Sequence, residues 1–212
     1  GPDAPRQASS VELLGGRLRH RGPDEAGSHH SPDASLAHQR LSIIDVACGK
    51  QPLLDGEGAV ALVCNGEIYN HGALRAGLED RHIFRTHSDS EALVHLYKER
   101  GTACVTELDG MFAFLVSSGE KFLAARDPLG IKPLYVGQHA GGTWFASELK
   151  ALPAECREVS ELPPGSTLSE SGEVRRWFRP PWVDAPRNPV EPNLDVLAEK
   201  LETAVVKRLM SD

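Results

Sequence analysis

The chain has 212 residues, of which 40% are hydrophobic, and its charged side chains leave a net charge of −7 at pH 7. This apolar content is enough for a globular core, and the acidic balance does not favour a nucleic-acid partner. No apolar run approaches the ~20 residues that span a bilayer, so the sequence predicts one large domain, or one domain and a fragment, with no membrane partner.

The first predicted elements are a helix and a strand. Ser9 and Glu12 match a capping box, and Val11 and Leu14 follow at helical spacing. Residues 36–44 are typical of a strand and contain one arginine, Arg40. By itself this pattern favours an exposed strand arginine.

A buried strand is predicted over residues 59–64, and Asn65, Gly66 and Glu67 follow it at once. Two interpretations are open from these residues alone. Asn-Gly is a strong turn signal, which would make Glu67 a solvated loop carboxylate. Alternatively, the Asn65 amide and the Gly66 N–H would together stabilise an oxyanion, because glycine permits close approach to a ligand.

A second helix is predicted to open at residues 88–91 and to end at Gly101. Asp89 in its first turn would stabilise the helix dipole whatever else it does. Four short apolar runs then predict strands, over residues 111–116, 122–125, 134–138 and 143–146. Helices and strands followed by a meander indicate an α+β layered domain.

Residues 179–193 are rich in proline, which is a stiff linker composition. Beyond them a last helix is predicted, because apolar residues recur at helical spacing. They are Leu194, Leu197, Leu201, Val205 and Leu209. So short a tail offers nothing obvious for this apolar face to pack on.

The cysteines and histidines suggest neither a metal site nor disulfides. Cys48, Cys64, Cys104 and Cys156 are scattered, and the nine histidines show no ligand spacing. His20, His29, His30 and His38 are expected to be loop or structural residues rather than ligands. We interpret the cysteines as reduced thiols of a cytoplasmic protein. Cys64 is predicted to be a core thiol, because it ends an apolar run.

Seven motifs occur in a fixed order along nearly the whole chain. They are HRGPD at 20–24, HQRLSIID at 38–45, NGEIYN at 65–70, THSD at 86–89, DGMFAF at 109–114, RDPLGIKPLY at 126–135 and ASELK at 146–150. In this order and at this spacing they resemble the N-terminal class II glutamine amidotransferase domain of glutamine-hydrolysing asparagine synthetases. The resemblance implies an α+β fold, the four-layer αββα sandwich of N-terminal-nucleophile hydrolases.

The resemblance also implies a division of the chain. Residues 1–178 would be the amidotransferase domain, 179–193 a linker, and 194–212 the first helix of an ATP-using synthetase domain. In that family the nucleophile is an N-terminal cysteine, whereas this chain begins Gly1-Pro2-Asp3-Ala4. We therefore expect the nucleophile on an upstream segment, and residues 1–212 to be inactive without it.

The implied reaction is hydrolysis of the glutamine side-chain amide. A thiolate attacks the carbonyl, ammonia leaves and water releases glutamate, with the α-amine of the cysteine as general base. By resemblance, Asn65 and Gly66 form the oxyanion hole. Arg40 holds the substrate α-carboxylate through two parallel hydrogen bonds.

The remaining implied roles concern the other end of the substrate and its surroundings. Asp89 is expected to bind the α-ammonium, with Glu67 as a second acceptor. The predicted substrate-binding set is completed by Leu41, Ile43 and Ile44. Without the resemblance, the side chains of Ile43 and Ile44 would be ordinary core. Charged residues of the other motifs are expected to be structural; they are Arg21, Asp24, Arg126, Asp127 and Lys132.

The implied partners follow from the same resemblance. Glutamine is the substrate and a covalently linked synthetase domain is the partner, with a homodimer left open. ATP and Mg²⁺ would belong to that synthetase domain, and no metal or cofactor to this one. Two rival functions are a non-catalytic scaffold in an asparagine-synthetase-like enzyme that forms amides or β-lactams, and a non-catalytic binding module.

Overall fold

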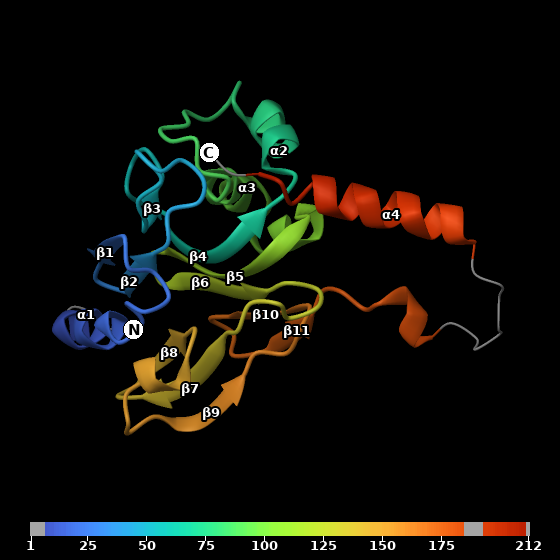
Figure 1. Cartoon of the computed structure of the whole chain (residues 1–212). Coiled ribbons are helices and arrows are strands. Elements are labelled where there is room, and N and C mark those ends of the chain that lie inside the picture. The colour runs from blue at the N-terminus through green and yellow to red at the C-terminus, as the bar shows by residue number, and fades with distance from the viewer. Residues whose placement is uncertain (1–6, 185–192, 211–212) are drawn as a thin grey trace.

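The structure is a computed structural model that describes residues 7–184 and 193–210. Its main sheet has six strands in the order β11-β10-β6-β5-β4-β3, with neighbouring strands antiparallel. Their bounds are β3 Leu53–Leu54, β4 Ala61–Ile68, β5 Gly110–Ser118, β6 Lys121–Arg126, β10 Ser166–Ser169 and β11 Val174–Arg176. Figure 1 shows α2 (His71–Leu78) and α3 (Glu91–Arg100) over one face of this sheet.

A second sheet lies across the other face. It has the order β8-β7-β9, with β7 at Tyr135–His139, β8 at Gly142–Ala146 and β9 at Arg157–Glu161. A separate hairpin pairs β1 (Glu25–His30) with β2 (Ser35–Arg40), and α1 (Ala8–Gly16) packs beside it. Short 3₁₀ turns occupy Gly101–Glu107, Leu149–Ala151 and Pro181–Val183.

Side-chain alternation along two strands explains the layering, because successive residues of a strand face opposite sides. On β5, Phe112 and Phe114 join the core beneath α3, whereas Ala113 joins the core between the two sheets. On β8, Phe145 contacts that inter-sheet core, while Trp144 packs with α1. Two helical layers therefore enclose two sheets, and the predicted four-layer αββα sandwich is confirmed.

Most predicted elements are confirmed, with shifted ends. The four predicted strands of the meander correspond to β5, β6, β7 and β8, and α3 ends at Gly101, whose φ is +55°. The capping box at Ser9 is wrong, because α1 already begins at Ala8 and its N-cap residue is Gln7, whose side chain makes no capping bond. Glu12 instead accepts hydrogen bonds from Ser28 and His30 of β1.

The predicted C-terminal helix is confirmed as α4, Leu194–Val206, which ends before Leu209 of the predicted pattern. The Asn193 side chain caps it by accepting from the backbone N–H groups of Asp195 and Val196. Its apolar residues are exposed. Residues 185–192, with Pro186, Pro189 and Pro192 of the predicted linker, lie outside the described residues. Within the described part of the chain, every helix is too short or too polar to cross a membrane.

Candidate active site

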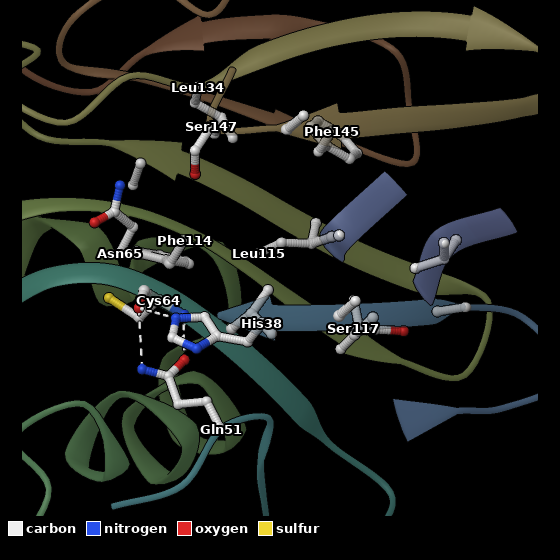
Figure 2. A pocket seen from close by; sticks show the side chains of 18 of the residues that line it. His38, Gln51, Cys64, Asn65, Phe114, Leu115, Ser117, Leu134, Phe145 and Ser147 are labelled. Atoms are coloured by element: carbon white, nitrogen blue, oxygen red, sulfur yellow. Dashed lines mark hydrogen bonds between the residues drawn. The ribbon is translucent and has the colours of Figure 1, made fainter. Parts of the chain in front are cut away.

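A cavity of about 710 Å³ lies between the main sheet and a wall made by β2 and β8 (Figure 2). One side is lined by residues of β4 and β5, and the other by β2, β8 and part of α1. The cavity brings together all eight predicted site residues. They are Arg40, Leu41, Ile43, Ile44, Asn65, Gly66, Glu67 and Asp89.

Asn65, Gly66 and Glu67 lie inside β4, so the predicted strand end at residue 64 is wrong. β5 pairs with β4 along its whole length, placing Asn65 opposite Ala113 and Gly66 opposite Phe112. Gly66 has φ +151°, and a β-carbon there would lie 2.0 Å from the Met111 carbonyl oxygen. Glycine is therefore required by close strand packing rather than by a turn.

The side chains of neighbouring β4 residues point to opposite faces. Asn65 projects toward the cavity, and Figure 2 shows it on the same side as Ser147 and Leu134. Its Nδ2 donor is buried and has no hydrogen-bond partner, which leaves the amide free to donate to a ligand. Cys64 faces the helix-covered core, 3% exposed.

Cys64 is a core thiol, as predicted. Burial raises the pKa of its thiol to about 12, so the nucleophilic thiolate is not populated near neutral pH. Its backbone is held by the Gln51 side chain, whose Oε1 accepts from the Cys64 N–H at 2.7 Å and whose Nε2 donates to the Cys64 carbonyl at 3.0 Å. His38 donates to the same carbonyl from Nε2 at 3.2 Å (Figure 2).

Arg40 lies at the end of β2 and is 6% exposed. Its Nη1 donates to Glu25 at 2.5 Å, and its Nη2 donates to the Ile44 carbonyl at 2.9 Å and the Asp45 carbonyl at 2.7 Å. The sequence predicted that the strand continues to residue 44. It ends at Arg40 because the following residues turn back and direct their carbonyls at the guanidinium.

Three predicted residues lie on this turn at the mouth of the cavity. The exposed fractions are 54% for Leu41 and 40% for Ile43, and Ile44 is half-buried. They are therefore not ordinary core. Asp24, predicted to be structural, accepts a hydrogen bond from the Ser42 N–H at 2.8 Å and so fixes this turn to the segment before β1.

Asp89 and Glu67 form an acidic pair at the cavity. Asp89 is 5% exposed and its Oδ2 accepts from the Ile68 N–H at 2.7 Å. Asp89 precedes the N-cap of α3, and its carboxylate binds β4 instead of capping the helix. Burial raises the pKa of both carboxyl groups, and the nearby Asp89 carboxylate raises that of Glu67 further. A ligand cation would relieve this repulsion.

The structure adds three cavity residues to which the sequence assigned other roles, namely Arg21, His38 and Lys132. His38 was expected to be structural, but it lines the cavity with an unpartnered, buried Nδ1, and burial lowers its pKa to about 4. Its place two residues before Arg40, on the same face of a strand, was the available signal. Lys132 was expected to pair with another group, and it also lines the cavity.

Arg126 and Asp127 are structural, as predicted. Arg126 donates to the carbonyls of Gly130, Lys132 and Leu162, and Asp127 accepts three backbone N–H groups of the same turn. Among the described residues, no group of three His, Cys, Asp or Glu side chains could hold a metal ion.

Comparisons with known proteins agree with this geometry. Residues 3–172 match the family model described as a glutamine amidotransferase domain. The chain is 49% identical over 210 residues to asparagine synthetase [glutamine-hydrolyzing] 2 of Arabidopsis thaliana, covering 96% of this chain and 36% of that protein. It is 47% identical to asparagine synthetase [glutamine-hydrolyzing] 2 of rice, Oryza sativa subsp. japonica, covering 96% and 35%.

A solved structure shares the fold. Glutamine phosphoribosylpyrophosphate amidotransferase from B. subtilis superposes with a TM-score of 0.64 and 26% identity, over 81% of this chain and 46% of that one. The chain spans about a third of the length of the plant relatives, 36% in the first case. On the family match and the extent of the identity, the chain belongs to the glutamine amidotransferase domain family.

Proposed function

We propose that this chain is the glutaminase part of an ATP-dependent asparagine synthetase, hydrolysing glutamine to glutamate and ammonia. The observation that carries the proposal is one cavity that collects an arginine, an acidic pair and an unpartnered amide. These groups match the α-carboxylate, the α-ammonium and the reacting carbonyl of glutamine, respectively. Because the relatives are named asparagine synthetases, we propose that the ammonia is used to amidate aspartate.

In this proposal the substrate is held by its two charged ends. Arg40 binds the α-carboxylate, because a guanidinium grips a carboxylate with parallel hydrogen bonds. To do so it would exchange part of the Glu25 and loop-carbonyl bonds that its Nη1 and Nη2 make in this structure. Asp89 and Glu67 bind the α-ammonium, which offsets the burial that raises the pKa of both carboxyl groups and the Asp89 charge that raises the pKa of Glu67 further. Leu41, Ile43 and Ile44 would narrow the mouth of the cavity around the substrate.

Catalysis would follow at the opposite end of glutamine. The Asn65 Nδ2 and the Gly66 N–H would donate to the carbonyl oxygen as it gains negative charge during thiolate attack. These donors lie on a fully paired strand, so they need no rearrangement when the charge develops. The amide nitrogen then leaves as ammonia, and water releases glutamate from the thioester.

We place the nucleophile on an N-terminal cysteine upstream of residue 1. Cys64 is unsuited to the role by its burial and raised pKa. In the described part of the chain β2 pairs only with β1, and β8 only with β7, so both present an unpaired edge beside the cavity. A strand seated between these edges would carry its first residue toward Asn65, with its α-amine as general base.

The rest of the enzyme would follow α4. We propose residues 1–178 as the glutaminase domain, 179–193 as a linker and 194–212 as the start of a synthetase domain that binds ATP, Mg²⁺ and aspartate. The exposed apolar side chains of α4 support a covering partner. The four cysteines are free thiols, which suits a reducing compartment, and we propose the cytoplasm.

The test is to extend the chain upstream to its own coding start and measure glutamate release from glutamine. The extended protein should turn over, whereas the 212-residue chain and an extended protein with alanine at the cysteine should not. Release of glutamate by the 212-residue chain at the rate of the extended one would overturn the assignment of the nucleophile. A silent extended protein, or an upstream segment without cysteine, would favour the scaffold function instead.

A further inference from the structure

Asp45 connects two loops that reach the cavity from different parts of the chain. It is 7% exposed and does not itself line the cavity. One carboxylate oxygen, Oδ1, accepts from the Cys48 N–H at 3.2 Å, within its own turn. The other, Oδ2, accepts at 2.8 Å from the N–H of His87, which lies 42 residues away. The carboxylate therefore joins the turn after β2 to the loop before α3.

The backbone of Asp45 sets the position of Arg40. Its φ is +51°, a conformation that non-glycine residues rarely adopt and that Asp and Asn tolerate best. In this conformation its carbonyl accepts from the Arg40 Nη2 at 2.7 Å and from the Gly49 N–H at 2.9 Å. A β-carbon on Gly49 would lie 2.6 Å from the Arg40 Nη2, so the turn closes tightly around the guanidinium.

On the other side, His87 lies two residues before Asp89. Glu91 braces this loop by accepting from the Arg85 N–H at 2.7 Å and the Thr86 N–H at 2.8 Å. Asp89 is in turn fixed to β4 through the Ile68 N–H. Through its carboxylate and its carbonyl, Asp45 thus contacts both the Asp89 loop and the Arg40 guanidinium.

We propose that Asp45 is a positioning residue that sets the separation between the Arg40 guanidinium and the Asp89 carboxylate. This inference rests on the proposed function. The α-carboxylate and α-ammonium of glutamine share one carbon, so the groups that bind them must be held at one distance. A misplacement of about 1 Å between binding groups and substrate can lower an enzyme's rate by ~10²-fold. Asp45 would therefore govern selectivity for substrates that carry both charges.

The test uses Asp45→Asn in the extended protein. Asparagine tolerates the positive φ but has one acceptor oxygen where aspartate has two, so one N–H loses its partner. We expect the KM for glutamine to rise about tenfold or more, the equivalent of one charged hydrogen bond. Saturated kcat should stay within about twofold, because Asn65 and Gly66 are held by β5 and not by Asp45.

Asp55→Asn is the matched control. Asp55 is also a buried aspartate, 2% exposed, that accepts two backbone N–H groups of its own turn, and it lies outside the cavity lining. It should lower the melting temperature at least as much, because it also loses the Lys98 ion pair, while leaving the KM unchanged. A KM rise of equal size in both variants would reduce Asp45 to a general stabilising role and overturn the proposal.

A substrate analogue distinguishes a positioning role of Asp45 from general disruption of the site. Glutaramate, which is glutamine without its α-amine, needs only the Arg40 end of the site, so the separation no longer matters. Asp45→Asn should therefore raise the KM for glutaramate much less than that for glutamine. In the double variant with Arg40→Lys, the rise in the KM for glutamine, expressed as a free energy, should be smaller than the sum of the two single-variant effects. Equal losses on both substrates and strict additivity would each contradict the proposal.

A second variant covers the case in which Asp45→Asn does not fold. Gly49→Ala leaves the carboxylate intact but crowds the same carbonyl and the Arg40 Nη2, and it should raise the KM for glutamine with kcat preserved. A normal KM in folded Gly49→Ala would then overturn the role of this turn. An inactive wild-type extended protein would instead refute the proposed function, so the two failures are distinguishable.

Discussion

The two walls of the cavity are built in different ways. β4 and β5 form a continuous antiparallel ladder from the Ala61–Ser117 pair to the Ile68–Gly110 pair. The opposite wall is divided between β2 and β8, which do not pair with each other in the part of the chain that is described. There the functional groups are fixed by side-chain contacts, as Arg40 is by Glu25 and loop carbonyls.

This difference matches the division of labour in the proposed reaction. The donors for the developing oxyanion lie on the rigid, paired wall, where electrostatic preorganisation is worth most. Of the groups that bind the charged end of the substrate, Arg40 ends β2 at the other wall and Asp89 lies beside α3, whereas Glu67 shares β4 with the donors. Variants on the two walls should therefore fail in different ways, and four predictions test this comparison from the largest expected effect to the smallest.

The largest effect is expected for packing on the paired wall. Leu62 of β4 is fully buried in the core beneath α3, so Leu62→Ala should lower the free energy of unfolding by about 3–5 kcal/mol. Leu36 of β2 is also buried but borders the cavity, so Leu36→Ala should cost less than half as much. Denaturant titration of both variants checks this, and equal costs would show that the walls are equally well packed.

Asn65→Ala in the extended protein should lower kcat for glutamine by ~10²–10³-fold while its affinity for glutamine changes little, because the oxyanion forms only during the reaction. Asn70→Ala is the control, since the Asn70 side chain bonds to the Glu107 carbonyl and the Asp109 N–H, away from the cavity. A mutant at Asn65 that binds poorly but turns over normally at saturation would make this amide a substrate clamp.

The free energy of unfolding should depend on pH through His38, which lies on the divided wall. Burial lowers its pKa from 6.5 to about 4. Between these values the unfolded chain takes up a proton that the folded chain does not, so stability is full above pH 6.5 and falls as the pH drops toward 4, by up to about 3 kcal/mol. His38→Gln should flatten this slope between pH 7 and 5, and His29→Gln should not. Identical slopes in all three proteins would place His38 in contact with water.

Arg40→Lys should weaken glutamine binding by about 1.5–3 kcal/mol, because a point charge replaces a bidentate fork. Arg126→Lys is the matched control, since Arg126 is equally buried and also donates to loop carbonyls and to a glutamate, outside the cavity lining. The dissociation constants of both variants, measured in the extended protein, distinguish a binding role from a structural one. An unchanged glutamine affinity in Arg40→Lys would make this arginine purely structural.

The resemblance predicted the sandwich, and the eight predicted site residues line one cavity, whereas the boundaries of the elements were predicted less well. Apolar runs such as 111–116 form strands whose side chains are buried on both faces of the sheet, so the positions of these strands could be predicted. The end of β4 was wrong because Asn-Gly is a turn signal locally, whereas pairing with β5 decides the outcome. The end of β2 was wrong because the bonds from the Arg40 guanidinium to the Ile44 and Asp45 carbonyls, which turn this segment back, leave no mark in a strand-like sequence.

The hydrogen bonds that hold the site residues in place could not be predicted. That Asp89 binds the Ile68 N–H instead of capping α3, or that Asp45 reaches His87, depends on loops brought together only in the folded chain. Strand β1 was not predicted, because none of its residues is fully buried and its sequence has no apolar run. The resemblance supplied roles for Arg40, Asn65, Gly66, Glu67 and Asp89, and these roles stay predictions.

The Gln51 side chain, which bonds both backbone groups of Cys64, has a consequence for solubility. Beyond the two-residue strand β3, it occupies the donor and acceptor that β4 would otherwise present to another chain. A free strand edge is a template for intermolecular pairing and aggregation. Replacing Gln51 with an aliphatic residue of similar size would leave this edge of β4, on the regularly paired wall, without its side-chain partner. We expect such a variant to aggregate and precipitate before it unfolds.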